Sequence, residues 1–318
     1  MTSDNSPRSL LSGIPVDLPI ASSNAPTNPQ VSGISDAFSR TNSPPSPTPN
    51  SSRQRRFIGP RQLDRLRNSL SPRDHAVLEI VAAHRYLTTR QIQSFCFHDH
   101  ASVAAGARTA SRVLRRLADH GLLKALERRV GGVRAGSASH IWQLGTVGYR
   151  LLRADGKLKR THEPSPRFLA HCLAVADTHL MLLRAQRQGI FRRVDVHCEP
   201  ESWRSFTGLG GERRVLQPDL FASTTQPRYV DRWFIEVDLG TESLPTLLGK
   251  CAVYEAYRKT GIEQSGAGVF PLVIWQLPSQ RRLDTLASAI ARSANLLPEL
   301  FRFTVPDDLV SVVTGGTT

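Results

Sequence analysis

The sequence predicts an α+β protein with two folded parts, the first a group of helices closed by a β-hairpin and the second an α/β part. In the first part, apolar residues recur at helical spacing in three segments between positions 71 and 123, and two short strand-like runs follow at 122–130 and 139–145. In the second part, which begins near position 166, helical and strand-like segments alternate. A chain of 318 residues is long enough to bury two cores.

Residues 1–56 are dominated by Ser, Pro, Asn and Thr, as in "TNSPPSPTPNSS", and show no hydrophobic periodicity. Such a segment buries too little apolar area to offset its conformational entropy, so we expect a disordered tail. The expected organisation is therefore this tail at 1–56, a first domain at 57–160 and a second domain at 161–318.

The composition indicates a cytoplasmic protein that does not cross a membrane. No run of 18 residues is continuously apolar, and the first residues lack the basic start and long apolar core of a secretory signal. The four cysteines are widely separated, which favours reduced thiols in the core over disulfides. The segment "CFHDH" at 96–100 lacks the second ligand pair of a structural zinc site, and we expect no zinc there.

The positive charge of the chain is concentrated in its middle. The formal net charge is +14, and residues 57–160 carry 19 basic and 7 acidic side chains, whereas residues 161–318 carry 17 of each. A basic field confined to one segment is typical of a module that binds nucleic acid.

The middle segment has the element order of a winged helix-turn-helix. Ser71 and Pro72 start a first helix, Thr88 or Thr89 caps a short second helix, and a third helix ends near Gly121. The hairpin, with "GGVRAGSA" at its tip, would be the wing. Arginines suited to contact DNA lie on the outer face of the third helix and in the wing: Arg108, Arg112, Arg115 and Arg116, and Arg128, Arg129 and Arg134. The alternative is a winged-helix dimerisation module, which would give a homodimer.

The second part begins with a helix over "PRFLAHCLAVADTHLMLLRAQRQG" and continues with strand-like runs at 191–202, 213–223 and 232–240. A helix, a strand, a second helix and a last strand follow at 244–261, 270–277, 280–296 and 300–305. This order predicts a mixed sheet flanked by helices. His171, His179 and His197 are expected to be structural or solvent-facing.

The run "FIEVDLGT" ends with two acids, Glu236 and Asp238, which lie two residues apart on a strand and therefore project from the same face. Carboxylates held close together repel each other, so the pair requires a cation or a solvent-exposed strand end. The cation is either a divalent metal or an arginine, and the pattern leaves both open.

Several segments resemble the replication-relaxation family, a group of actinobacterial proteins linked to plasmid replication and DNA relaxation. They are "RDHAVLEIVAAHRYLTTRQIQ", "RTASRVLRRLADHGLL", "HCLAVAD", "QPDLF" and, most specifically, "EVDLGTES". The second part also resembles the PD-(D/E)xK nuclease core, which implies a restriction-endonuclease-like sheet. On that resemblance, Asp219, Glu236 and Asp238 would bind Mg²⁺ or Mn²⁺, and Lys250 would replace the lysine that the motif lacks here. Glu199 is a weaker fourth candidate.

The expected function is a DNA-binding protein of a plasmid or other mobile element that acts in replication and relaxation, together with plasmid replication or relaxation proteins. In this interpretation the nuclease-like domain has lost its activity. One alternative is an active Mg²⁺-dependent endonuclease or nickase that the winged helix directs to double-stranded DNA. Another is a scaffold whose second domain binds protein.

Overall fold

The computed structural model describes residues 59–130, 139–152, 163–208 and 210–315, which belong to one compact unit. The predicted tail at 1–56 and Arg134 of the expected wing lie outside the described residues. Arg128 and Arg129 are on a described strand, but the positions of their side chains are not described.

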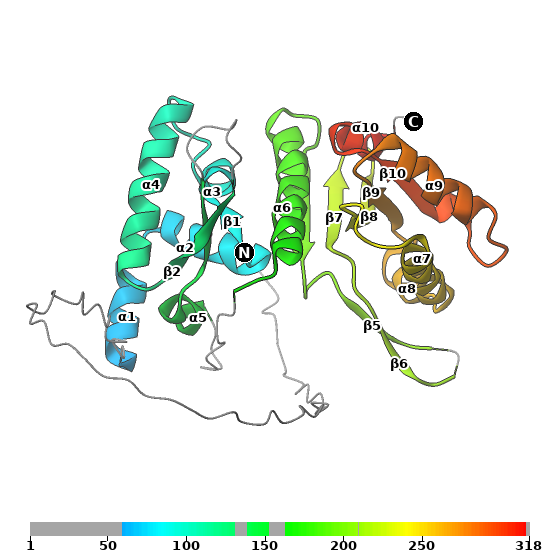
Figure 1. Cartoon of the computed structure of the whole chain (residues 1–318), viewed down its shortest axis with the longest axis horizontal. Helices are drawn as coiled ribbons and strands as arrows, with labels where there is room; N and C mark the ends of the chain where they lie inside the picture. Colours follow the sequence, from blue (N-terminus) through cyan, green and yellow to red (C-terminus); the bar gives the residue numbers. More distant parts are fainter. Residues whose placement is uncertain (1–58, 131–138, 153–162, 209, 316–318) are drawn as a thin grey trace, which may run out of the picture. The chain divides into compact units, whose positions relative to one another are not determined.

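The amino-terminal part of the described chain begins with four helices (Figure 1). They are α1 (Pro60–Ser69), α2 (Pro72–His84), α3 (Thr89–Cys96) and α4 (Val103–Asp119). Ser71 and Asp74 form a capping box at the start of α2, and Thr88 and Gln91 form one at the start of α3, so both helix starts follow from local sequence. Helix α1 was not predicted.

A small antiparallel sheet follows these helices. Its strand order is β1 (Leu87–Thr88), β3 (Ser139–Leu144) and β2 (Leu123–Val130), and α5 (Thr146–Leu152) comes directly after it. The predicted order of three helices and a hairpin is therefore present, with α1 and the short strand β1 as additions.

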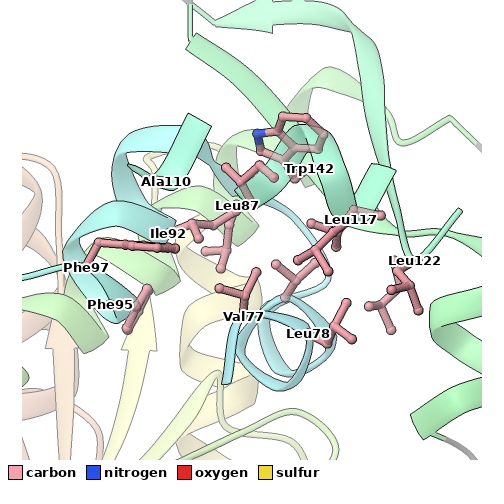
Figure 2. Packing of buried hydrophobic residues seen from close by; sticks show 14 of the residues in the cluster. Val77, Leu78, Leu87, Ile92, Phe95, Phe97, Ala110, Leu117, Leu122 and Trp142 are labelled. Carbon is pink, nitrogen blue, oxygen red and sulfur yellow. The ribbon is translucent and has the colours of Figure 1, made fainter. Parts of the chain in front are cut away.

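The core of this part is formed by α2, α3, α4 and the small sheet. Figure 2 shows Val77, Ile92 and Leu117 pointing toward one another from the three helices. Ala176 and Leu180 of the next helix, α6 (Pro166–Arg187), belong to the same buried cluster. A fragment that ended at position 160 would expose this side of the core.

Helix α6 is apolar because it is buried on two sides. It has the length and hydropathy of a candidate membrane span, and no other helix among the described residues meets that test. Leu180 packs into the amino-terminal core, whereas Val175 and Leu182 pack against the sheet of the second part. Burial between two cores accounts for this composition.

The second part is built on a five-stranded mixed sheet with the order β10-β9-β8-β7-β4. The strands are β4 (Arg193–Cys198), β7 (Leu220–Thr225), β8 (Val230–Val237), β9 (Leu272–Gln276) and β10 (Phe301–Thr304). Strands β8, β9 and β10 are parallel, and β7 and β4 are antiparallel to their neighbours.

Helices cover both faces of this sheet (Figure 1). Side chains of α6 and α10 (Leu309–Val313) pack on one face, and side chains of α7 (Leu244–Lys259) and α9 (Gln280–Ala291) pack on the other. Alternation along β8 sends Trp233, Ile235 and Val237 toward α6 and sends Phe234 and Glu236 toward α7. The predicted mixed α/β architecture with an open sheet is confirmed.

One predicted strand is two strands. The run at 213–223 divides into β6 (Arg213–Leu216) and β7, and β6 pairs with an unpredicted strand, β5 (Arg204–Thr207), in a separate hairpin. Pro218 lies at the break and has no N–H to donate to a ladder, so a continuous central strand could not form there. Helices α8 (Ile262–Ala267) and α10 were also not predicted.

Candidate functional site

Asp219 and Glu236 meet at the end of the β7–β8 ladder. Leu220 pairs with Ile235 in this antiparallel ladder, so the next residue outward on each strand is one of the two acids. Asp219 is buried, and one of its carboxylate oxygens accepts a hydrogen bond of 2.7 Å from the backbone N–H of Val237. The sheet register thus brings together two of the predicted site residues.

Glu236 is enclosed by helix α7. The Tyr254 hydroxyl donates a hydrogen bond of 2.6 Å to Oε1, and Lys250 Nζ lies 3.5 Å from Oε2. Burial, reinforced by the negative charge of Asp219, raises the pKa of Glu236 to about 8. This carboxyl group therefore holds a proton more readily than an exposed glutamate.

Lys250 projects from α7 toward Glu236, and its Nζ also lies 3.1 Å from Oε2 of Glu242. We call Asp219, Glu236 and Asp238 the acidic cluster. Burial alone would lower the pKa of Lys250, but the charges of Glu236, Asp219 and Glu242 outweigh this effect and raise it. Lys250 is therefore a fixed cation at neutral pH. Lys250, which the sequence interpretation proposed as a substitute for the lysine of the nuclease motif, thus lies beside Glu236.

His171, which was predicted to be structural or solvent-facing, contacts one of the predicted site residues. It lies on α6, and its Nε2 is 2.9 Å from Oδ1 of Asp219, an interaction that raises the pKa of His171. His179 is buried, and His197 is exposed on β4. The histidines of α6 have no distinctive spacing in the sequence, and only the packing of α6 on the sheet shows that His171 reaches Asp219.

Asp238 has a different partner from the other two acids. It follows β8, and its Oδ2 accepts a hydrogen bond from Nε of Arg282 on α9. Gly240, at φ 78°, turns the chain so that its N–H donates to the other oxygen of Asp238 at 3.0 Å. Arginine is thus the cation beside Asp238, whereas Asp219 and Glu236 lie near His171 and Lys250.

Two pockets adjoin the cluster and share His171 in their walls. One, of about 150 Å³, is lined by Asp219 and by Glu199, which forms an ion pair of 2.8 Å with Arg85. The other, of about 260 Å³, is lined by Asp238 and Lys250. Asp219 and Asp238 are therefore accessible to small ligands, each from a different pocket, whereas the buried Glu236 lines neither pocket.

The basic residues of α4 form a second candidate surface. Arg108, Arg112 and Arg115 are exposed at positions i, i+4 and i+7, and none has an ion-pair partner among the described residues. Arg116 differs because it forms an ion pair with the buried Asp74, which caps α2. We call Arg108, Arg112 and Arg115 the α4 arginine face.

Comparison with known proteins identifies the family. No curated protein and no solved structure matches the chain. The family model described as Replication-relaxation matches residues 78–273, which is more than half of the chain. The match extends from α2 into β9, and it includes the α4 arginine face, Asp219, Glu236 and Lys250. The chain therefore belongs to the replication-relaxation family.

Proposed function

We propose that this chain is a DNA-binding protein of a plasmid or other mobile element that acts in replication and relaxation, with residues 57–160 as a winged-helix module. The α4 arginine face carries the proposal. Three exposed arginines in one row, without acidic partners among the described residues, repel one another unless an anion neutralises them. A phosphate backbone supplies negative charge along such a row.

The arrangement suits a helix that enters the major groove. Helix α4 has 17 residues, and its apolar side chains Leu114 and Leu117 hold it on the core while the arginine face points outward. The planar guanidinium group forms two hydrogen bonds at once with phosphate or with the guanine edge. Strands β2 and β3 would then lie along the DNA backbone as the wing.

Binding of the full chain to labelled duplex DNA, followed by fluorescence anisotropy over a series of salt concentrations, tests the proposal. The affinity should fall steeply as salt rises, because each phosphate contact releases counterions. Duplex should bind more tightly than a single strand of the same length. An absence of binding at low salt would contradict the proposal.

A second candidate function is cleavage or nicking of the bound DNA with Mg²⁺ or Mn²⁺. The convergence of Asp219, Glu236 and Lys250 favours it, because it reproduces the two acids and the lysine of the nuclease motif. The donor set fits a hard divalent ion, which takes one or two carboxylates and keeps several waters. Asp238 contributes less to this site because Arg282 already balances its charge.

In this function Asp219 and Glu236 would hold the ion, which would supply a Lewis acid and an activated water. Lys250, protonated at neutral pH, would stabilise negative charge on the phosphate that is attacked, and it would not act as a base. His171 would hold a proton near Asp219 and could donate it during the reaction.

Incubation of the full chain with supercoiled plasmid, with and without Mg²⁺ or Mn²⁺, tests this second function. We expect nicked product that disappears in Asp219→Asn and in Lys250→Ala. Asp284→Asn, which alters an exposed acid on α9, is the matched control and should nick normally. If the plasmid stays intact and calorimetry detects no binding of either ion, the non-catalytic functions remain.

A further inference from the structure

Three metal-binding side chains from distant parts of the sequence meet in the interior, outside the acidic cluster. His84 is the last residue of α2, His179 lies on α6, and Cys198 is the last residue of β4. All three are buried, and one potential ligand atom of each lies within 4.8 Å of the others. The described residues contain no other group of three such ligands.

Two of the three distances between these atoms are close to the edges of a zinc tetrahedron. Zinc bonds of about 2.0–2.1 Å to nitrogen and about 2.3 Å to sulfur place two nitrogens about 3.4 Å apart and a nitrogen and a sulfur about 3.6 Å apart. His84 Nε2 lies 3.0 Å from His179 Nδ1 and 3.6 Å from Cys198 Sγ. A shift of a few tenths of an ångström in one ring would bring the distance between the two nitrogens to the tetrahedral value.

Metal binding would change the hydrogens carried by this group of side chains. His84 Nε2 and His179 Nδ1 lie at hydrogen-bond distance, so one of these nitrogens carries a hydrogen, and that ring would change tautomer to bind an ion. The Cys198 thiol would lose its proton, because a thiol that coordinates a metal is deprotonated.

The site has an entry path and room for a fourth ligand. His84 and Cys198 line the pocket of about 150 Å³ that also contains Glu199 and Asp219. This volume is large enough for a water molecule, and polar side chains lie within it. The residues that follow His84 and Cys198 also contact each other, because Arg85 forms an ion pair with Glu199.

We propose that His84, His179 and Cys198 bind Zn²⁺, with a water from the pocket as the fourth ligand. Two imidazoles and one thiolate are a borderline-soft donor set, which suits zinc and not the hard ion proposed for the carboxylates. The ion would join α2 of the amino-terminal part to α6 and to β4 of the second part. This site is independent of the proposed DNA-binding and nuclease functions.

Cobalt substitution tests the proposal with the full chain. Protein freed of metal with a chelator is titrated with Co²⁺, which reports thiolate and tetrahedral coordination by its absorption spectrum. We expect binding at one ion per chain with a thiolate-to-cobalt charge-transfer band and intense visible bands, and both should disappear when Zn²⁺ displaces the cobalt. Zn²⁺ should also raise the melting temperature by mass action.

Three variants identify the ligand. Cys198→Ala should lose the charge-transfer band, whereas Cys251→Ala, which removes a buried thiol from the core on the opposite face of the sheet, should keep it. Asp219→Asn should also keep the band, which separates this site from the acidic cluster. The absence of a charge-transfer band in the unaltered protein, or a band of full intensity in folded Cys198→Ala, would overturn the proposal.

Discussion

The α4 arginine face and the acidic cluster of the sheet part differ in how their charge is balanced. Arg108, Arg112 and Arg115 share one exposed helix face without acidic partners among the described residues. In the acidic cluster, by contrast, a basic side chain lies beside each acid, with His171 beside Asp219, Lys250 near Glu236 and Arg282 beside Asp238. The positive charge of the α4 arginine face is therefore unbalanced within the protein, whereas the charges in and around the acidic cluster nearly cancel.

This difference in charge balance means that a ligand gains different electrostatic free energy in the two regions. A polyanion that contacts α4 removes a repulsion that the free protein carries, so binding gains from charge that the fold leaves unbalanced. A divalent ion at the acidic cluster must instead compete with a lysine already held there. We therefore expect strong, salt-dependent binding of DNA and weaker binding of Mg²⁺.

The largest expected effect is on DNA affinity. Changing all three residues of the α4 arginine face to Ala should weaken duplex binding by at least about 100-fold at low salt, since each base or phosphate contact contributes about 1–3 kcal/mol. The slope of log affinity against log salt should become shallower. The matched control changes three exposed arginines outside α4, Arg228, Arg281 and Arg292, and should bind normally. Equal losses in the two variants would show that only total charge matters.

The next largest effect concerns the ion pair at Asp238. Arg282→Ala should lower the free energy of unfolding by about 3 kcal/mol, because it leaves a carboxylate buried without its cation. Arg281→Ala, a change at the adjacent exposed residue, should have almost no effect. Chemical denaturation of both variants measures the difference, and similar midpoints would show that solvent reaches Asp238.

A smaller effect is expected on the pH dependence of stability. The pKa of Glu236 is raised to about 8 in the folded state, so the folded protein retains a proton that the unfolded chain loses near pH 4.5. The contribution of Glu236 to the free energy of unfolding is therefore complete below pH 4.5, and it is lost as the pH rises through about 8. His171, whose pKa is also raised, contributes in the same direction as the pH rises above 6.5.

Replacing Glu236 with Gln isolates its share of this dependence. The decrease in melting temperature between pH 5 and pH 9 should be smaller in Glu236→Gln than in the unaltered protein, with the remainder due to other groups. Glu201→Gln, at an exposed glutamate on the surface, should leave the profile unchanged. Parallel profiles for all three proteins would mean that Glu236 is ionised in the fold.

Much of the fold could be predicted from local sequence. The capping residues Ser71 and Thr88 mark helix starts, and alternation in the run from Trp233 to Asp238 marks the acid-bearing strand. The hairpin of β5 and β6 could not be predicted in the same way. Its two strands have four residues each, which is too short for a clear alternation of apolar and polar residues. Their pairing depends on tertiary contacts.

The acidic site was predictable only in part. Asp219 directly precedes β7 and Glu236 lies in β8, so the register of the two strands brings Asp219 to Glu236. Arg282, the partner of Asp238, is 44 residues further along the chain, on helix α9. No sequence pattern connects the two, since their contact depends on how α9 packs on the sheet. For the same reason the cluster of His84, His179 and Cys198 was not predicted.

The smallest expected effect is a gain in stability at α4. Arg112 lies one turn from both Arg108 and Arg115, and like charges at these spacings destabilise a helix by about 0.2–0.5 kcal/mol per pair. Gln and Arg have similar helix propensities, so Arg112→Gln should raise the free energy of unfolding by a few tenths of a kcal/mol at low salt while it weakens DNA binding. The gain should vanish at high salt, where the charges are screened. Arg116→Gln is the matched control and should destabilise the protein, since it removes the partner of buried Asp74. A loss of stability in Arg112→Gln at low salt would show that the arginine face is already balanced within the protein, and the contrast between the two regions would then fail.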